Sequence, residues 1–146
     1  MSKITLTSAA AGALCVLLCA PPAALAGPAQ CGRIVMNDKS LRNEGVYGVT
    51  LLEIDGKAPF RHKYDHSVAV GTHRLLLGEK IPQHDLAYSV QRHRDRSIRN
   101  RELTLEVKAD ERIVIAAKLD AEHKDDVNAY WMPLVLKDES KPCKPD

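Results

Sequence analysis

Three histidines lie close together in the sequence and could bind a metal ion. On an extended strand His62 and His66 would share one face, and His73 follows a predicted turn. Imidazole is a common ligand of both Zn²⁺ and Cu²⁺. The spacing matches no established zinc signature, and His66 can instead border the core, because the valines of its segment share its parity. A histidine metal site is therefore the alternative functional hypothesis.

The strongest local charge bias is a run of arginines. Its members are Arg92, Arg94, Arg96, Arg99 and Arg101. A guanidinium group pairs with phosphate or carboxylate through parallel hydrogen bonds, so this run is a candidate site for an anionic partner. That partner would be an envelope protein or an anionic envelope surface. Nucleic acid is not expected, because few aromatic side chains are available for stacking on bases. The simpler alternative is a solvated hairpin end that discourages edge-to-edge aggregation.

No catalytic motif stands out, so the sequence predicts a protein that is not an enzyme and needs no cofactor. The G-x-S-x-G, H-E-x-x-H, P-loop and C-x-x-C patterns are all missing from the sequence. The formal net charge is +2, so no global electrostatic field favours one class of partner. Any function must therefore come from local sites.

The N-terminal residues have the pattern of a secretory signal peptide, residues 1–26. Lys3 supplies the positive start, Ala9–Ala20 the apolar core, and Ala24-Leu25-Ala26 a small-x-small cleavage triplet. The apolar run is too short for a helix that spans a bilayer, which needs about 20 residues. We expect a periplasmic protein that does not span the membrane, with secretion into the medium as the alternative.

Two cysteines stay in the mature chain, Cys31 and Cys143, because Cys15 and Cys19 leave with the signal peptide. In an oxidising compartment an even number of cysteines usually forms disulfides. A bond between these two would link the ends of a single domain over residues 27–146. We therefore expect a domain closed by a terminal disulfide.

Short segments that alternate apolar and polar residues dominate the mature chain and indicate an all-β fold. The clearest is Glu102–Ala109, which has the period of a half-buried antiparallel strand. Gly45–Ile54 is apolar on both faces, which predicts a central strand. The other expected strands are Cys31–Asn37, Tyr64–Val70, Thr72–Leu77, Arg112–Leu119 and Ala129–Leu136. We predict a single antiparallel β-sandwich of about seven strands.

Other local signals refine this prediction. Asp55-Gly56 is a turn dipeptide, and Pro133 marks its strand as an edge strand or a bulged one. Asp85–Asn100 is the one helical candidate, with a short strand and a loop as the equal alternative. Residues 137–146 form a polar tail, for which Cys143 is the expected anchor.

The segment Val49–Leu77 resembles a known group of exported bacterial modules. It contains Ile54-Asp55-Gly56-Lys57 and then Val68-x-Val70-Gly71-Thr72-His73-Arg74-Leu75. This arrangement is similar to the PEGA-type and related prealbumin-like or carboxypeptidase-regulatory-like β-sandwiches. It departs from the usual PEGA pattern at Ala58–Lys63. The resemblance implies a sandwich fold and an accessory binding or packing role without catalytic residues.

Together these features predict an exported, non-catalytic accessory or binding module. We expect contact with a protein partner through an exposed sheet edge or through the arginine run, in an oligomeric state that the sequence leaves open. The alternative is a periplasmic zinc or copper protein that uses His62, His66 and His73.

Overall fold

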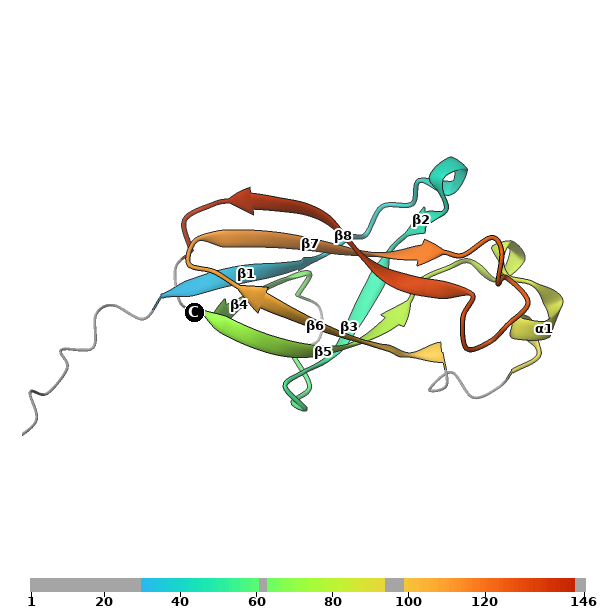
Figure 1. Cartoon of the computed structure of the whole chain (residues 1–146), viewed down its shortest axis with the longest axis horizontal. Helices are drawn as coiled ribbons and strands as arrows, with labels where there is room; N and C mark the ends of the chain where they lie inside the picture. Colours follow the sequence, from blue (N-terminus) through green and yellow to red (C-terminus); the bar gives the residue numbers. More distant parts are fainter. Residues whose placement is uncertain (1–29, 61–62, 94–98, 144–146) are drawn as a thin grey trace, which may run out of the picture.

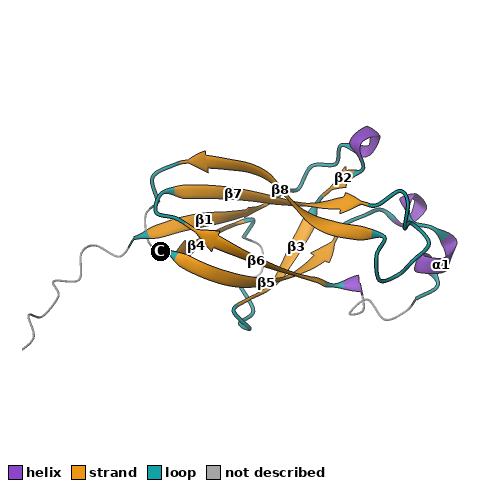
Figure 2. Ribbon diagram, viewed as in Figure 1, coloured by secondary structure: helices purple, strands orange, loops and turns teal. Residues whose placement is uncertain are grey.

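The computed structural model describes residues 30–60, 63–93 and 99–143, and this part of the chain is nearly all β-strand (Figure 2). The signal-like segment 1–26 lies outside the described residues. The strands are β1 Cys31–Met36, β2 Val46–Tyr47, β3 Val49–Ile54, β4 Asp65–Ala69, β5 Gly71–Glu79, β6 Arg101–Val107, β7 Glu111–Leu119 and β8 Trp131–Ser140. The helical elements are short: η1 Arg42–Glu44, η2 Gln83–Asp85 and α1 Tyr88–Gln91. The all-β prediction is confirmed.

The strands form two sheets that enclose one hydrophobic core (Figure 1). The first sheet has the order β8, β7, β1 and β4, and β2 continues beyond β1 along the same side of β7. The second sheet has the order β3, β5 and β6. Ile34 and Ile115 of the first sheet and Leu75 and Leu77 of the second are fully buried in this core. Burial of such side chains is the main stabilising contribution of the fold.

One strand pair is parallel, so the prediction of purely antiparallel strands is wrong at this point. β1 runs parallel to β7, from Arg33 opposite Arg112 to Met36 opposite Ile115. The other described pairs are antiparallel. A parallel pair needs a long crossover, and here the chain leaves β1, builds the second sheet and returns as β7. A strand has the same alternating sequence pattern whether its neighbour runs parallel or antiparallel. The sequence therefore could not predict the direction of the β1–β7 pair.

The prediction of one central strand over Gly45–Ile54 is also wrong. The segment divides at Gly48 into β2 and β3, which belong to different sheets, and β3 is the edge of the second sheet. A Cβ at Gly48 would lie 3.1 Å from the Asn37 carbonyl oxygen, so glycine permits the close backbone approach where the chain changes sheets. The segment is apolar on both faces because β2 and β3 belong to different sheets and therefore pack against different neighbours.

Two turn and edge predictions are confirmed, and two others are corrected. Asp55 and Gly56 both have positive φ, at 51° and 75°, and make a tight turn. Pro133 lies on β8, which pairs only with β7 among the described residues and is therefore an edge strand. Among the described residues of the helical candidate Asp85–Asn100, only α1 is α-helical. The polar tail begins later than expected, because β8 continues to Ser140.

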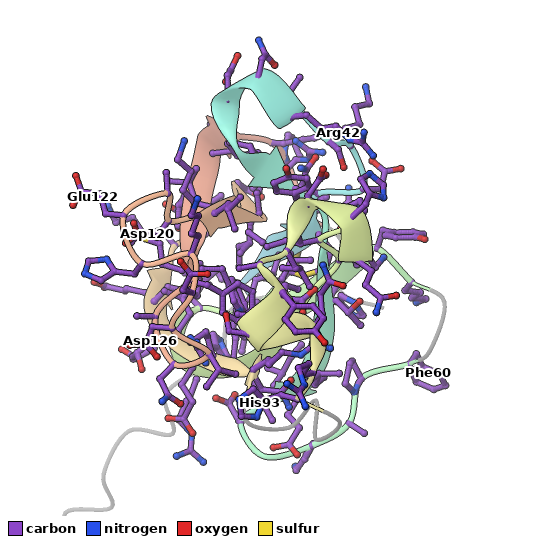
Figure 3. All side chains as sticks on the ribbon, turned by 90° about the vertical axis from the view of Figure 1, so that its right-hand side faces the viewer. Arg42, Phe60, His93, Asp120, Glu122 and Asp126 are labelled. Atoms are coloured by element: carbon purple, nitrogen blue, oxygen red, sulfur yellow. A yellow bond between two sulfur atoms is a disulfide. The ribbon has the colours of Figure 1, made fainter. Side chains whose placement is uncertain are left out.

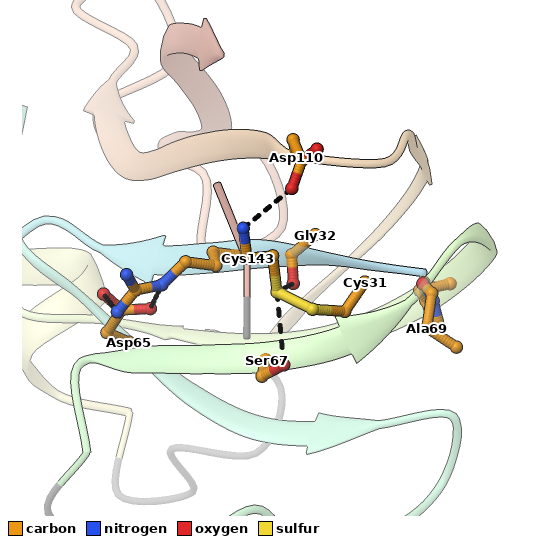
Figure 4. Close-up of a disulfide and its surroundings, with 9 residues drawn as sticks. Cys31, Gly32, Asp65, Ser67, Ala69, Asp110 and Cys143 are labelled. Carbon is orange, nitrogen blue, oxygen red and sulfur yellow. Dashed lines mark hydrogen bonds and ion pairs between the residues drawn. A yellow bond between two sulfur atoms is a disulfide. The ribbon is translucent and has the colours of Figure 1, made fainter. Parts of the chain in front are cut away.

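The predicted disulfide joins Cys31 and Cys143, whose Cα atoms lie 5.6 Å apart (Figure 4). The segment after β8 crosses the start of β7 on its way to β1. Its backbone N–H groups at Lys141 and Cys143 donate to the carbonyl and carboxylate oxygens of Asp110, at 2.6 and 2.8 Å. β8 and β1 lie on either side of β7, so the disulfide holds residues 141–143 across the N-terminal end of β7. We call residues 141–143 together with the disulfide the disulfide strap.

Gly32, next to the disulfide, has no space for a side chain. A Cβ there would overlap the Val107 side chain and lie 2.7 Å from the Lys108 carbonyl oxygen. We therefore expect Gly32→Ala to lower the free energy of unfolding by about 1–3 kcal/mol through overpacking, measured by urea denaturation. At Gly78 the nearest atom would lie 3.5 Å away, so Gly78→Ala is the matched control and should be close to neutral. Equal losses in the two variants would contradict the steric argument.

Candidate functional site

A hollow of about 840 Å³ lies beside β3 and the C-terminal end of β5. Thr50 and Leu52 of β3 line one side, and Gln91 near α1 lines another. Arg99, a member of the arginine run, and His93, which lies between Arg92 and Arg94, also line it. α1 lies at the opposite end of the molecule from the start of β1, where Cys31 forms the disulfide (Figure 1). The hollow is therefore far from the disulfide strap.

A second hollow, of about 460 Å³, also lies beside β3. The two share Thr50, Leu52 and Lys80 as lining residues. The second is also lined by the exposed rings of Phe60 and Tyr64. We call the two together the β3 groove, because β3 runs through both.

The edge of β3 that faces away from β5 carries no strand in the described part of the chain. The pairing register shifts between Leu51 and Glu53, so Leu52 is bulged out of the ladder. The Leu52 side chain lies over Gly78 and lines both hollows. A bulge typically redirects a side chain next to a functional surface. Here it presents an apolar side chain beside an open strand edge.

A buried ion pair forms part of the wall of the larger hollow. The Arg99 guanidinium lies 3.2 Å from the Glu79 carboxylate, and only 12% and 7% of their side chains are exposed. Glu79 also accepts hydrogen bonds from the Tyr130 hydroxyl at 2.9 Å and from the Ile81 N–H at 3.0 Å. Burial, followed by the nearby Glu79 charge, raises the pKa of Tyr130, so its hydroxyl stays a donor. Both charges of the pair are therefore already neutralised.

The described arginines of the predicted anionic site play different roles. Arg99 is in the buried pair, and the Arg101 guanidinium lies 5.6 Å from the Trp131 ring and donates to the Val127 carbonyl. Arg92 is exposed, with its guanidinium 5.5 Å from the Tyr88 ring. Two members lie outside the described residues, namely Arg94 and Arg96. Arg99 and Arg101 already have partners within the protein, so an anionic partner would have to bind Arg92, Arg94 and Arg96. That binding stays a prediction.

The predicted metal ligands are not brought together among the described residues. His66 is buried on β4 and lines the β3 groove. Both ring nitrogens of His73 are occupied, by the Asp55 carboxylate at 2.7 Å and the Ala69 carbonyl at 2.8 Å. His62 lies outside the described residues. In the part of the chain that is described, no three His, Cys, Asp or Glu side chains could hold a metal ion, and the metal hypothesis stays a prediction.

No protein-family model, curated protein or solved structure matches this chain. Within the described residues, no helix is long and apolar enough to cross a membrane. Lys80, Tyr64 and Leu52 were not singled out by any sequence pattern. They come from three separate segments, and only the packing of β3 beside β4 and the end of β5 brings them to one groove. The function must therefore be argued from the groove itself.

The buried pair makes a stability prediction. Arg99→Met would leave the Glu79 carboxylate buried without its cation, so we expect the free energy of unfolding to fall by about 3–5 kcal/mol. The double variant Arg99→Met with Glu79→Gln should recover much of this loss, because no buried charge is left. Exposed Arg92→Met is the control and should change little. A double variant no more stable than Arg99→Met would contradict the charge argument.

The Asp55–His73 pair makes a pH prediction. Both ring nitrogens of His73 face acceptor oxygens, and only the imidazolium ion can donate from both. Burial alone would lower the pKa of His73, but the hydrogen bonds to Asp55 and Ala69 raise it overall. The backbone hydrogen bond from Arg74, and then His73, lower the pKa of Asp55.

A raised histidine pKa stabilises the fold below the unfolded value of about 6.5, and the effect is lost as the pH rises through the folded value. A lowered aspartate pKa stabilises the fold above about 3.9 and is lost at lower pH. We therefore expect His73→Gln to reduce the urea midpoint more at about pH 5.5 than at about pH 8.5. Exposed His93→Gln is the control. An equal reduction of the midpoint at both pH values would refute the role of the imidazolium ion.

Proposed function

We propose that this protein is an exported, non-catalytic binding module that takes an extended segment of a partner protein into the β3 groove. The observation that carries the proposal is that the edge of β3 away from β5 lies beside two hollows that share Thr50, Leu52 and Lys80 as lining residues. An open edge offers main-chain N–H and C=O groups for an added strand, and pockets beside it select side chains. The N–H groups of Val49 and Ile54 on β3 already donate to the Asn37 and Lys57 carbonyl oxygens, at 3.1 and 2.9 Å. The main-chain groups left for a partner therefore lie around Leu51, beside the side-chain pockets of the groove.

Two other open edges among the described strands, those of β8 and β6, fit this role less well. β8 contains Pro133, which lacks a donor, and β6 presents the exposed charged side chains Glu102 and Glu106. Proline and charge at an edge are devices that discourage strand addition. β3 has no proline and one charged residue, Glu53, over its six residues, and the bulged Leu52 faces the groove beside it. β3 is therefore the edge to which we assign the partner.

Export to the periplasm, with secretion as the alternative, is part of the proposal. The signal-like N-terminus supports it, as does the Cys31–Cys143 disulfide, since such bonds persist in oxidising compartments. Two sheets around one core support a β-sandwich related to the PEGA-type modules, with the parallel β1–β7 pair as a departure from a purely antiparallel arrangement.

The test is site-specific photo-crosslinking in the native host, with a photoreactive phenylalanine analogue placed on each open edge in turn. We expect a discrete protein adduct from Leu52 on β3 and none from Glu106 on β6. Val135 on β8 is the second comparison, because it is exposed on an edge strand. Adducts from Val135 alone would place the partner on β8, and no adduct from Leu52 would reject the β3 assignment.

A further inference from the structure

We infer that the segment bound by the β3 groove is acidic and alternates carboxylate with apolar side chains. This inference rests on the proposed function, because it names the chemistry of the partner that the same groove would take. It is carried by the charges and the apolar surface of the described lining residues.

The charged lining of the groove is basic apart from one residue. The described lining residues that carry a full charge are the cations Lys63, Lys80 and Arg99 and the anion Glu79. Glu79 is already neutralised by Arg99 and hydrogen-bonded to Tyr130. An incoming carboxylate would therefore meet no exposed like charge among the described lining residues, whereas an incoming ammonium group would meet the lysines.

Two lysines of the groove are held against aromatic rings. The Lys80 ammonium lies 4.9 Å from the centre of the Tyr64 ring, and the Lys63 ammonium lies 6.0 Å from that of Phe60. The rings are well exposed, Tyr64 by 52% and Phe60 by 83%. A cation–π contact orients the ammonium but leaves its charge in place. The groove wall therefore combines apolar ring surface with positive charge.

Beneath this wall the groove is apolar. Met36, Val49 and Leu51 line the smaller hollow, and all three are buried core residues. Successive side chains of an added strand would point to opposite faces. One set would then lie over these apolar side chains, and the other would lie toward the lysines. This geometry favours a segment with alternating apolar and acidic residues.

The charge distribution of the surface points the same way. In the end-on view of Figure 3, Asp120, Glu122 and Asp126 lie on the side of the molecule away from Phe60. The whole chain has a formal net charge of only +2, so its attraction for an acidic segment must be local. Complementary local potentials steer a charged partner toward one face and away from the other.

The experiment measures fluorescence anisotropy of labelled decapeptides added to the oxidised mature protein. The three probes alternate aspartate with valine, alternate lysine with valine, or repeat the aspartate peptide with N-methyl groups on alternate residues. We expect the aspartate peptide to bind, and the other two to bind at least about tenfold more weakly, a difference of about 1.4 kcal/mol.

Protein variants test the same inference from the other side. Lys80→Glu and the milder Lys80→Gln should both weaken binding of the aspartate peptide, the first by about tenfold. Lys124→Glu is the matched control, because Lys124 is exposed in the loop between β7 and β8 and does not line the groove. Thermal melting of each variant shows whether it is folded.

The outcomes separate the two proposals. If the lysine peptide binds as well as the aspartate peptide, the acidic preference is overturned and strand addition stands. If the N-methylated peptide binds as well, strand addition is overturned and the acidic preference stands. Binding of the aspartate peptide that is unchanged in folded Lys80→Glu would remove the groove from the inference. Failure of all three peptides to bind would overturn both proposals.

Discussion

The disulfide strap over β7 is the constraint on which the rest of the structure depends. β7 is paired on both sides, with β8 along one edge and with β1 and β2 along the other. The disulfide links the start of β1 to the segment that follows β8, and Asp110 at the start of β7 accepts hydrogen bonds from that segment. β1 is thus joined at one end to β7 and β8, which are distant from it in sequence. A link across so long a loop stabilises the fold chiefly by restricting the unfolded chain.

This arrangement also decides where the sheets stay open. The first sheet ends at β4 and the second at β3, and each of these strands has a strand partner on only one side among the described residues. The β3 groove lies at this opening, lined by residues of β1, β3, β4 and the loop before β4. The β3 groove is therefore a consequence of how two sheets of different width share one core.

Where the β3 groove meets the core, the negative charge of Glu79 is paired with the positive charge of Arg99. Glu79 ends β5, and its carboxylate is shared by Arg99, Tyr130 and the backbone at Ile81. The Trp131 ring nitrogen donates to the Arg99 carbonyl at 2.8 Å. These contacts join the end of β5, the start of β6 and the start of β8. The charge of Arg99 is therefore compensated within the protein.

The sequence by itself determined the all-β composition, the paired cysteines, the Asp55-Gly56 turn and the edge position of the strand with Pro133. Each of these depends on local chemistry: the period of side chains in a strand, an even cysteine count, positive φ at a turn, or a missing N–H group. Local patterns contain no information on which strands pair or in which direction.

Only the tertiary structure decided the remaining features. It divided Gly45–Ile54 between two sheets, made β1 parallel to β7, and buried Arg99 while leaving Arg92 exposed. It also brought Leu52, Tyr64 and Lys80 to one groove. The physical reason is that these features are contacts between distant segments, and their energies depend on packing and burial that no single segment specifies.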